Sequence, residues 1–227
     1  MFRKWSQALP AYVEVCPVQL PGRETRQRER LCTDLTALVP VLADALQPLL
    51  DRPFAIFGHS MGAVLGFEWA RYLRHHYALT PKHLLVSGGH APQLPPAHSP
   101  LHRLPNAAFL HEVWRRYQGI PEVVWREPEL MAWFLPILRA DFTMLETYTY
   151  VAEAPFDCPL SAFGGLQDPH VSHDGLVAWR HQVCGAFRLS MFPGGHFFVN
   201  EHPEPLLQAI SHALQATVSE STPIYEA

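Results

Sequence analysis

The stretch that decides the fold class is Pro53-Phe-Ala-Ile-Phe-Gly-His-Ser-Met-Gly62. Its first half, Pro53–Phe57, is an apolar run that predicts a β-strand, and the chain from Met61 to Arg74 predicts a helix. Between them lies a Gly-x-Ser-x-Gly motif centred on Ser60. In a tight strand-to-helix turn, we expect the flanking glycines to remove Cβ atoms that would collide, and the serine hydroxyl to be exposed. The stretch therefore predicts a nucleophilic Ser60; the alternative is a glycine-lined turn that serves packing alone.

Short apolar runs alternate with helical stretches along the whole chain. The runs that predict strands are Tyr12–Val18, Pro53–Phe57, His83–Ser87, Pro159–Phe163 and Phe187–Phe192. Continuous apolar runs of this kind are typical of strands that are covered on both faces. The main helices are predicted at Thr33–Leu50, Met61–Arg74 and Pro205–Ala216. We therefore expect an α/β fold with a mostly parallel central sheet flanked by helices, in a single domain over residues 1–227.

One region interrupts this alternation. From His90 to Pro105 the chain is rich in proline, which predicts a loop. Two helices are predicted after it, one from Asn106 to Tyr117 and one from Glu129 to about Arg139. The region contains many aromatic and other large apolar residues. They belong either to ordinary helical core or to a helical insertion that covers a site and lines an apolar pocket.

Composition excludes several classes of protein. The 227 residues are 48% hydrophobic, which excludes a disordered chain. The chain has 17 basic and 21 acidic residues, so it has no excess of positive charge to bind the phosphate backbone of nucleic acid. No apolar run reaches the length of a membrane span, and polar Ser6-Gln7 stands where a secretory signal would be apolar, so we expect a cytoplasmic protein. The four cysteines are scattered without metal-ligand spacing, and we expect buried free thiols.

A serine hydroxyl needs a base to take its proton and an acid to orient that base. Asp168 follows the predicted strand at 159–163, and Pro169 biases it toward an extended backbone. His196 follows the strand at 187–192 on a Gly-Gly turn. The chain order Ser60, Asp168, His196 is the order found in α/β-hydrolases, so we predict that these three residues form a catalytic triad.

Other histidines and acids compete for these roles. His59 is in the turn and cannot readily face its neighbour Ser60, and His90 is out of order because it precedes the helical region. His170 and His173 flank the loop of Asp168 and are expected at the surface. The rival acids are Asp157 and Asp174, each expected at the surface or as a cap, while Asp141 is expected to be held locally near Arg139.

Several further blocks occur in order along the chain. They are Gln19-Leu-Pro-Gly-Arg-Glu24, Phe67-Glu-Trp-Ala-Arg71, Gly119-Ile-Pro-Glu122, Leu135-Pro-Ile-Leu-Arg-Ala-Asp-Phe142 and Phe192-Pro-Gly-Gly-His-Phe-Phe198. With the serine motif, they resemble the type II thioesterases that accompany nonribosomal peptide and polyketide synthases, within the α/β-hydrolase superfamily. The resemblance implies hydrolysis of acyl groups from the phosphopantetheine arms of acyl- or peptidyl-carrier-protein domains, which edits stalled or misprimed synthases. It also implies a helical lid at about residues 95–150.

The beginning of the chain departs from this family. Members usually start with a further strand that ends in a Phe-Pro-x-Ala-Gly-Gly-like loop, before the part that matches Phe2-Arg-x-Trp5. That loop usually supplies one backbone N–H of the oxyanion hole, and the other would come from Met61. The resemblance therefore predicts impaired activity, since the loss of one donor costs on the order of 10²–10³ in rate. It also predicts one of two outcomes for the strands at 12–18 and 53–57. Either their backbone hydrogen-bonding groups are left without a partner strand, or the two strands move together and pair with each other.

Two alternatives to a carrier-protein thioesterase stay open at this point. An esterase that acts on free small esters would use identical chemistry. A degenerate hydrolase, catalytically impaired, would bind a carrier domain without turnover. The triad calls for no metal or organic cofactor, and a monomer is the simplest expectation.

Overall fold

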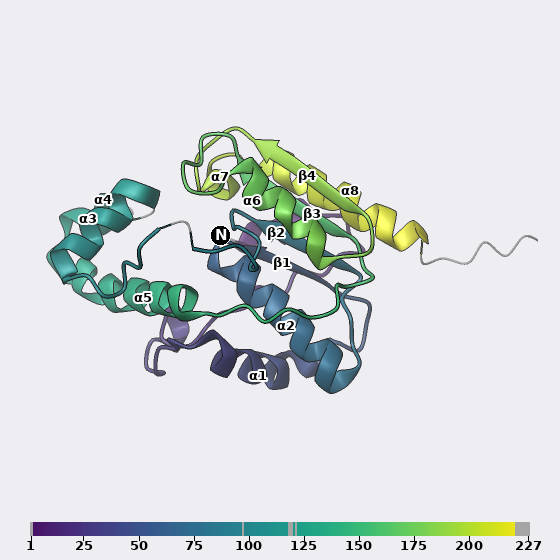
Figure 1. Cartoon of the computed structure of the whole chain (residues 1–227), viewed down its shortest axis with the longest axis horizontal. Coiled ribbons are helices and arrows are strands. Elements are labelled where there is room, and N and C mark those ends of the chain that lie inside the picture. Colours follow the sequence, from purple (N-terminus) through teal and green to yellow (C-terminus); the bar gives the residue numbers. More distant parts are fainter. Residues whose placement is uncertain (1, 97, 118–119, 121, 221–227) are drawn as a thin grey trace, which may run out of the picture.

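The computed structural model describes residues 2–96, 98–117, 120 and 122–220, so Gly119 and Pro121 of the block Gly119–Glu122 lie outside the described residues. The strands are β1 (Ala55–His59), β2 (His83–Ser87), β3 (Leu160–Gly165) and β4 (Phe187–Phe192). Within the described residues they form one parallel sheet in the order β1-β2-β3-β4 (Figure 1). The prediction of a parallel sheet is confirmed, and four of the five predicted strands are present with small shifts at their ends.

Helices surround the sheet. The α-helices are α1 (Leu35–Leu46), α2 (Met61–Tyr77), α3 (Asn106–Tyr117), α4 (Glu122–Arg126), α5 (Pro128–Thr147), α6 (His173–Val177), α7 (Phe198–Glu201) and α8 (Pro203–Glu220). The 3-10 helices are η1 (Phe2–Gln7), η2 (Glu24–Arg26), η3 (Gln47–Leu49) and η4 (Ala178–Gln182). The predicted helices are all present, although α5 continues eight residues past its predicted end, and the short helices α4, α6 and α7 were not predicted. In the described part of the chain, no helix is long and apolar enough to cross a membrane.

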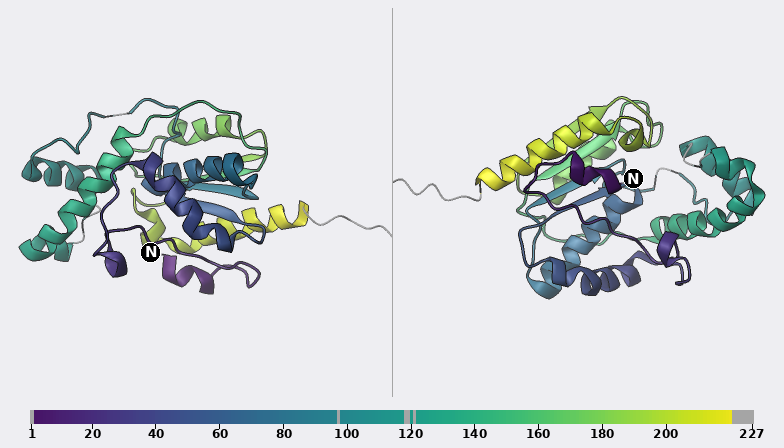
Figure 2. Two further views of the ribbon diagram at one scale, coloured as in Figure 1. Left: turned by 90° about the horizontal axis from the view of Figure 1, so that it is seen from below. Right: turned by 180° about the vertical axis from the view of Figure 1, so that it is seen from behind.

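The two faces of the sheet are covered by different helices, because side chains alternate along each strand. Leu84 and Val86 of β2 pack with α2, α6 and η4 in one apolar cluster. Leu85, between them, packs on the other face with α8 and with Trp5 of η1. Figure 2 shows the same layers, with α8 and η1 on one side of the sheet and α2 on the other. The sheet is therefore buried on both faces, as its apolar strands predict.

The prediction of a strand at Tyr12–Val18 is wrong. This segment is extended but pairs with no strand in the described chain, and β1 is the edge of the sheet. Val13 and Val15 instead pack on the apolar cluster beneath α8, while the intervening residues face solvent. Apolar burial thus occurs without strand pairing. Of the two alternatives given for this segment and β1, the described residues show the one in which the two do not pair with each other.

Other differences from the predictions are local. Asp34 caps α1 by accepting from the N–H groups of Thr36 and Ala37, so the helix begins two residues later than predicted. The expectation of buried thiols is wrong: all four cysteines are free, but Cys16 and Cys184 are exposed and the other two are half-buried.

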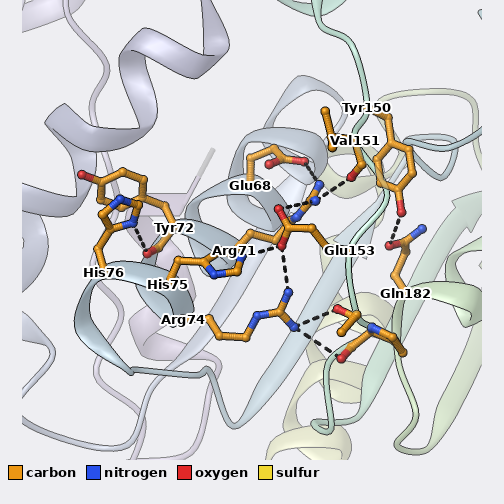
Figure 3. A network of polar contacts seen from close by, with 12 residues as sticks. Glu68, Arg71, Tyr72, Arg74, His75, His76, Tyr150, Val151, Glu153 and Gln182 are labelled. Atoms are coloured by element: carbon orange, nitrogen blue, oxygen red, sulfur yellow. Dashed lines mark hydrogen bonds and ion pairs between the residues drawn. The ribbon is translucent and has the colours of Figure 1, made fainter.

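A buried arginine ties α2 to the segment that follows α5. Arg71 donates to Glu68 at 2.7 Å and to the Val151 carbonyl at 2.5 Å, and it pairs with Glu153 at 2.5 Å. Tyr148 donates to the same Glu68 carboxylate at 2.6 Å. Figure 3 shows Arg71 with its partners Glu68, Val151 and Glu153 between the helix and the returning chain. Because a buried guanidinium without partners is costly, the network favours one position for this segment.

Candidate active site

Ser60 occupies the sharp turn between β1 and α2. Its φ of 55° and ψ of −120° are rare for a residue with a Cβ atom. The turn is fixed to the neighbouring strand, since the Ser60 N–H donates to the Ser87 carbonyl at 2.7 Å. A Cβ atom on Gly58 would overlap the backbone of Gly62, whereas a Cβ atom on Gly62 would meet nothing within 4 Å. The predicted role of the flanking glycines is therefore correct for Gly58 and wrong for Gly62.

Two loops leave the carboxyl ends of β3 and β4 and are bonded to each other. We call them the β3 loop (residues 166–172) and the β4 loop (residues 193–197). The Gln167 N–H donates to the Gly194 carbonyl at 2.9 Å, and the Gln167 side-chain oxygen accepts from the Gly194 N–H at 2.5 Å. Gly194 has a φ of 111°, which side-chain-bearing residues rarely adopt. These bonds hold the two loops in a fixed relation.

The loops bring the predicted base and acid to Ser60. His196 Nε2 lies 2.9 Å from Ser60 Oγ, and His196 Nδ1 lies 2.7 Å from Asp168 Oδ2. The second carboxylate oxygen, Asp168 Oδ1, accepts from the backbone N–H groups of His170 at 2.9 Å and Val171 at 3.3 Å. The Asp168 side chain has no exposed surface, and the His196 side chain is 4% exposed. The three side chains thus form one hydrogen-bonded chain, in which the acid and the base are buried and Ser60 is partly buried.

The charge on Asp168 fixes the direction of these hydrogen bonds. Burial alone would raise the pKa of Asp168, but the hydrogen bond and charge of His196 and the two backbone N–H groups outweigh it, so the pKa lies below its usual value. An ionised carboxylate can only accept, so His196 Nδ1 carries the proton and Nε2 presents its lone pair to the Ser60 hydroxyl. This arrangement lets the imidazole take the serine proton while Asp168 stabilises the resulting positive charge.

His59 lies beside the triad but is turned away from the serine hydroxyl. Its Nδ1 is 3.0 Å from Ser87 Oγ, and its ring centroid is 5.1 Å from that of His196. Burial and the adjacent His196 lower the pKa of His59 to about 3, so it is neutral at physiological pH. The expectation that His59 does not face Ser60 agrees with this geometry.

The other competing histidines serve the β3 loop. His90 Nε2 accepts from the Ser172 N–H at 3.0 Å, and burial lowers the pKa of His90. His170 is only partly exposed and contacts His98, while His173 is exposed as expected. In the structure these rings support or flank the loop of Asp168, and none of them contacts Ser60 Oγ within the described hydrogen bonds.

The rival acids lie elsewhere. Asp157 and Asp174 are exposed, as expected. Asp141 is not held by Arg139: it accepts two hydrogen bonds from Arg23, at 2.8 and 3.1 Å, and that expectation is wrong. Arg139 instead donates to backbone carbonyls of the 102–104 loop. The two residues are only two positions apart on α5, which is roughly 200° around the helix, so their side chains leave it in different directions.

Met61 is the first residue of α2, directly after Ser60. The first N–H groups of an α-helix have no partner within the helix, and the helix dipole makes this end attractive to negative charge. Met61, predicted as the oxyanion donor, therefore has its N–H at the helix end that favours negative charge. Among the described residues, no group of three histidine, cysteine, aspartate or glutamate side chains is arranged to hold a metal ion.

The family model described as Thioesterase domain matches residues 1–214. The chain belongs to the thioesterase family. The resemblance predicted from the sequence is confirmed, and with it the α/β-hydrolase fold, whose parallel sheet is flanked by helices. The comparisons with individual proteins lead to the same family.

This thioesterase is 43% identical to gramicidin S biosynthesis protein GrsT of Aneurinibacillus migulanus, over 96% of this chain and 85% of the relative. Among solved structures, it is similar to the RedJ thioesterase from the prodiginine pathway of Streptomyces coelicolor, with a TM-score of 0.87 and 39% identity over 93% of this chain and 84% of that one. The type II thioesterase BorB from the borrelidin biosynthetic cluster matches with a TM-score of 0.81 and 32% identity, over 94% and 85% of the two chains.

Tyr117 is a neighbour of the triad that the sequence did not single out. It is the last residue of α3, and its ring centroid lies 5.1 Å from that of His196. The sequence places it at the end of a predicted helix far from the serine motif, among many other aromatic residues. No signal in the sequence distinguishes it from those residues, because the contact depends on where the end of α3 lies relative to the β3 and β4 loops.

Proposed function

We propose that this thioesterase uses a Ser60–His196–Asp168 triad to hydrolyse acyl groups from the phosphopantetheine arms of acyl- or peptidyl-carrier domains of a synthase. The observation that carries the proposal is the continuous hydrogen-bonded chain from Ser60 Oγ through the His196 ring to Asp168. Family membership supports thioester hydrolysis, and several relatives are described as proteins of nonribosomal peptide or polyketide pathways. Free small esters and a binding role without catalysis are outcomes that the tests below distinguish.

In the first half-reaction, Ser60 Oγ attacks the thioester carbonyl carbon as His196 Nε2 removes the hydroxyl proton. The negative charge that develops on the carbonyl oxygen is stabilised by the Met61 N–H, and the positive charge on the imidazole by Asp168. The carbon–sulfur bond then breaks, and the thiolate of the phosphopantetheine arm takes the proton from His196. The products are the free arm and an acyl ester on Ser60.

The second half-reaction repeats these steps with water. His196 Nε2 removes a proton from a water molecule, whose oxygen attacks the ester carbonyl carbon. The bond from carbon to Ser60 Oγ breaks, and Ser60 regains its proton from His196. The carboxylic acid leaves, and the triad returns to its starting state, so the cycle consumes one thioester and one water.

The helices α3, α4 and α5 fit the lid of this site. Figure 1 places them together beyond the carboxyl ends of the strands. They have an apolar cluster of their own, formed by Leu101, Phe109, Val113 and Ile120 with partly buried neighbours. A unit with its own core at the mouth of the site suits a lid that covers an acyl chain and keeps out water.

Replacement of Ser60 tests the nucleophile directly. We expect Ser60→Ala to abolish hydrolysis of an acyl-carrier substrate and labelling by a serine-directed phosphonate probe. Ser211→Ala, which removes a hydroxyl bonded within α8, is the matched control and should leave both unchanged. Activity of Ser60→Ala equal to that of the unchanged protein contradicts the proposed triad.

Comparison of substrates tests the leaving group and partner. We expect kcat/KM to be much higher for an acyl group on the phosphopantetheine arm of a carrier domain than for the same acyl group on a small ester. Equal values would favour an esterase. Binding of the acylated carrier domain without turnover would favour the impaired, carrier-binding hydrolase.

A further inference from the structure

Tyr117 joins the α3–α5 region to the catalytic base. Its ring meets the His196 ring edge-on, with centroids 5.1 Å apart and planes at 67°. On its other sides, the ring lies 5.0 Å from the His170 ring and 5.5 Å from the Phe142 ring of α5. Tyr117 is therefore held between the lid helices and the two loops that carry Asp168 and His196.

The contacts of His170 extend this packing to the surface. The His170 ring lies 5.4 Å from the ring of His98, and His170 Nδ1 is 3.3 Å from His98 Nε2. The backbone N–H of His170 also donates to Asp168. A column of rings thus runs from exposed His98 to His196, and Tyr117 is the member that touches the base.

The ring of Tyr117, and not its hydroxyl, makes these contacts. In the part of the chain that the structure describes, the hydroxyl has no hydrogen-bond partner, and the residue is half-buried. Burial raises the pKa of Tyr117, so the phenol is protonated at physiological pH. Its contribution at this position is therefore the shape and apolar surface of an aromatic ring.

We propose that Tyr117 is a positioning residue for the proposed triad: its ring limits rotation of the His196 imidazole and shields the His196–Asp168 hydrogen bond from water. A charge-assisted hydrogen bond is stronger where water is excluded. The distance from His196 Nε2 to Ser60 Oγ also depends on the orientation of the imidazole, and small displacements of catalytic groups lower the rate considerably. This inference rests on the proposed function, because it assigns a neighbour to His196 acting as base.

Two substitutions of Tyr117 separate the ring from the hydroxyl. We expect Tyr117→Phe to keep kcat close to that of the unchanged protein. We expect Tyr117→Ala to lower kcat by roughly ten- to hundredfold, with a much smaller change in KM. Trp114→Ala is the matched control, because Trp114 is an exposed aromatic residue on the same helix, packed on Trp125 and not on the triad. It should leave kcat unchanged.

A spectroscopic readout distinguishes positioning from general stability. The proton on His196 Nδ1, bonded to Asp168, should give a far-downfield proton resonance in the unchanged protein and in Tyr117→Phe. In Tyr117→Ala we expect this resonance to broaden as exchange with water becomes faster. If the alanine variant does not fold, Tyr117→Leu, which keeps apolar volume but no ring, is measured in its place with the same expectations.

Two results overturn the inference. One is a Tyr117→Phe enzyme as slow as Tyr117→Ala, which would assign the effect to the hydroxyl. The other is a full kcat and an unchanged downfield resonance in Tyr117→Ala. If Ser60→Ala abolishes activity while Tyr117→Ala does not reduce it, the role of Tyr117 fails and the proposed triad stands. Activity that survives Ser60→Ala contradicts the triad itself.

Discussion

Arg23 donates to both carboxylate oxygens of Asp141, from Nη2 to Oδ1 at 2.8 Å and from Nη1 to Oδ2 at 3.1 Å. The pair joins the loop before η2 to the middle of α5, across 118 residues of sequence. Two parallel hydrogen bonds from a planar guanidinium define the position of both side chains more closely than a single contact does. The pair therefore ties the proposed lid to the body of the molecule.

Removal of Arg23 should destabilise the fold. Arg23→Gln leaves the largely buried Asp141 carboxylate unpaired, and we expect it to lower the free energy of unfolding by about 1–3 kcal/mol. The double variant Arg23→Gln with Asp141→Asn should lose less than the sum of the two single variants, because it leaves no unpaired charge. Denaturant unfolding at neutral pH measures all three. Additive losses would show that the pair contributes nothing as a pair.

The effect of Arg23→Gln should also depend on pH. Burial raises the pKa of Asp141 despite the opposing contribution of Arg23. A carboxyl with a raised native pKa binds its proton more tightly in the folded state, so its charge lowers stability as pH rises through that pKa. Without Arg23 this loss is larger, so the destabilisation should be greatest at neutral pH. It should shrink as pH falls through the raised pKa of Asp141, because the carboxyl is then protonated in the folded state with or without Arg23. A pH-independent difference would contradict this account.

The sequence predicts the sheet and the triad for the same reason. β2 and β3 are buried along their whole length because both of their faces are covered, and parallel strands place their following loops at one edge. Asp168 and His196 could therefore be placed near Ser60 from their positions after strands, without knowledge of side-chain contacts. The failure at Tyr12–Val18 has the same origin, since apolar content indicates burial and does not reveal whether a partner strand is available.

Contacts between distant segments could not be predicted. Asp141 has Arg139 as a charged neighbour in sequence, but Arg23 reaches it because α5 packs beside the N-terminal loop. Tyr117 meets His196 for a similar reason, since the end of α3 lies against the β3 and β4 loops. Local patterns encode periodicity and turns, whereas these contacts depend on how complete elements are arranged.

The two glycines of the serine motif should differ in their tolerance of substitution. Gly58→Ala places a Cβ atom against the Gly62 backbone, and we expect it to lower the free energy of unfolding by about 1–3 kcal/mol or more. Gly62→Ala adds a methyl group in open space within α2, and we expect a gain of roughly 0.5–1 kcal/mol. Thermal unfolding of the matched pair measures the difference. Equal losses would contradict the geometry of the turn.

Replacement of the proposed orienting acid should reduce turnover without unfolding the protein. Asp168→Asn removes the charge that stabilises the imidazolium and no longer enforces the Nδ1–H form of His196. We expect kcat to fall by roughly 10³–10⁴. Asp174→Asn, at an exposed aspartate of the following α6, is the control and should keep full activity. An Asp168→Asn enzyme with normal kcat would remove this residue from the triad.

Glu153 should make the stability of the fold sensitive to acid. It pairs with Arg71 at 2.5 Å, Arg74 at 3.0 Å and His75 at 2.7 Å, as Figure 3 shows. Burial opposes ionisation, but these partners together lower the pKa of Glu153 to about 2. A lowered native pKa means that the unfolded chain binds the proton more readily. The stabilisation is therefore complete above the unfolded pKa of about 4.3 and is lost as pH falls toward 2.

Glu153→Gln should remove this dependence. We expect it to lower the free energy of unfolding by roughly 1–2 kcal/mol at neutral pH, after allowance for solvent screening, and to flatten the loss of stability between about pH 4.5 and 2. Glu14→Gln is the matched control, because Glu14 forms a 3.5 Å pair with Arg52 in which both side chains are exposed. Urea unfolding across this pH range measures both variants. Because exposed ion pairs contribute little, the Glu14 variant should follow the unchanged protein at every pH, and an equal flattening in both variants would contradict a specific role for the Arg71–Glu153 network.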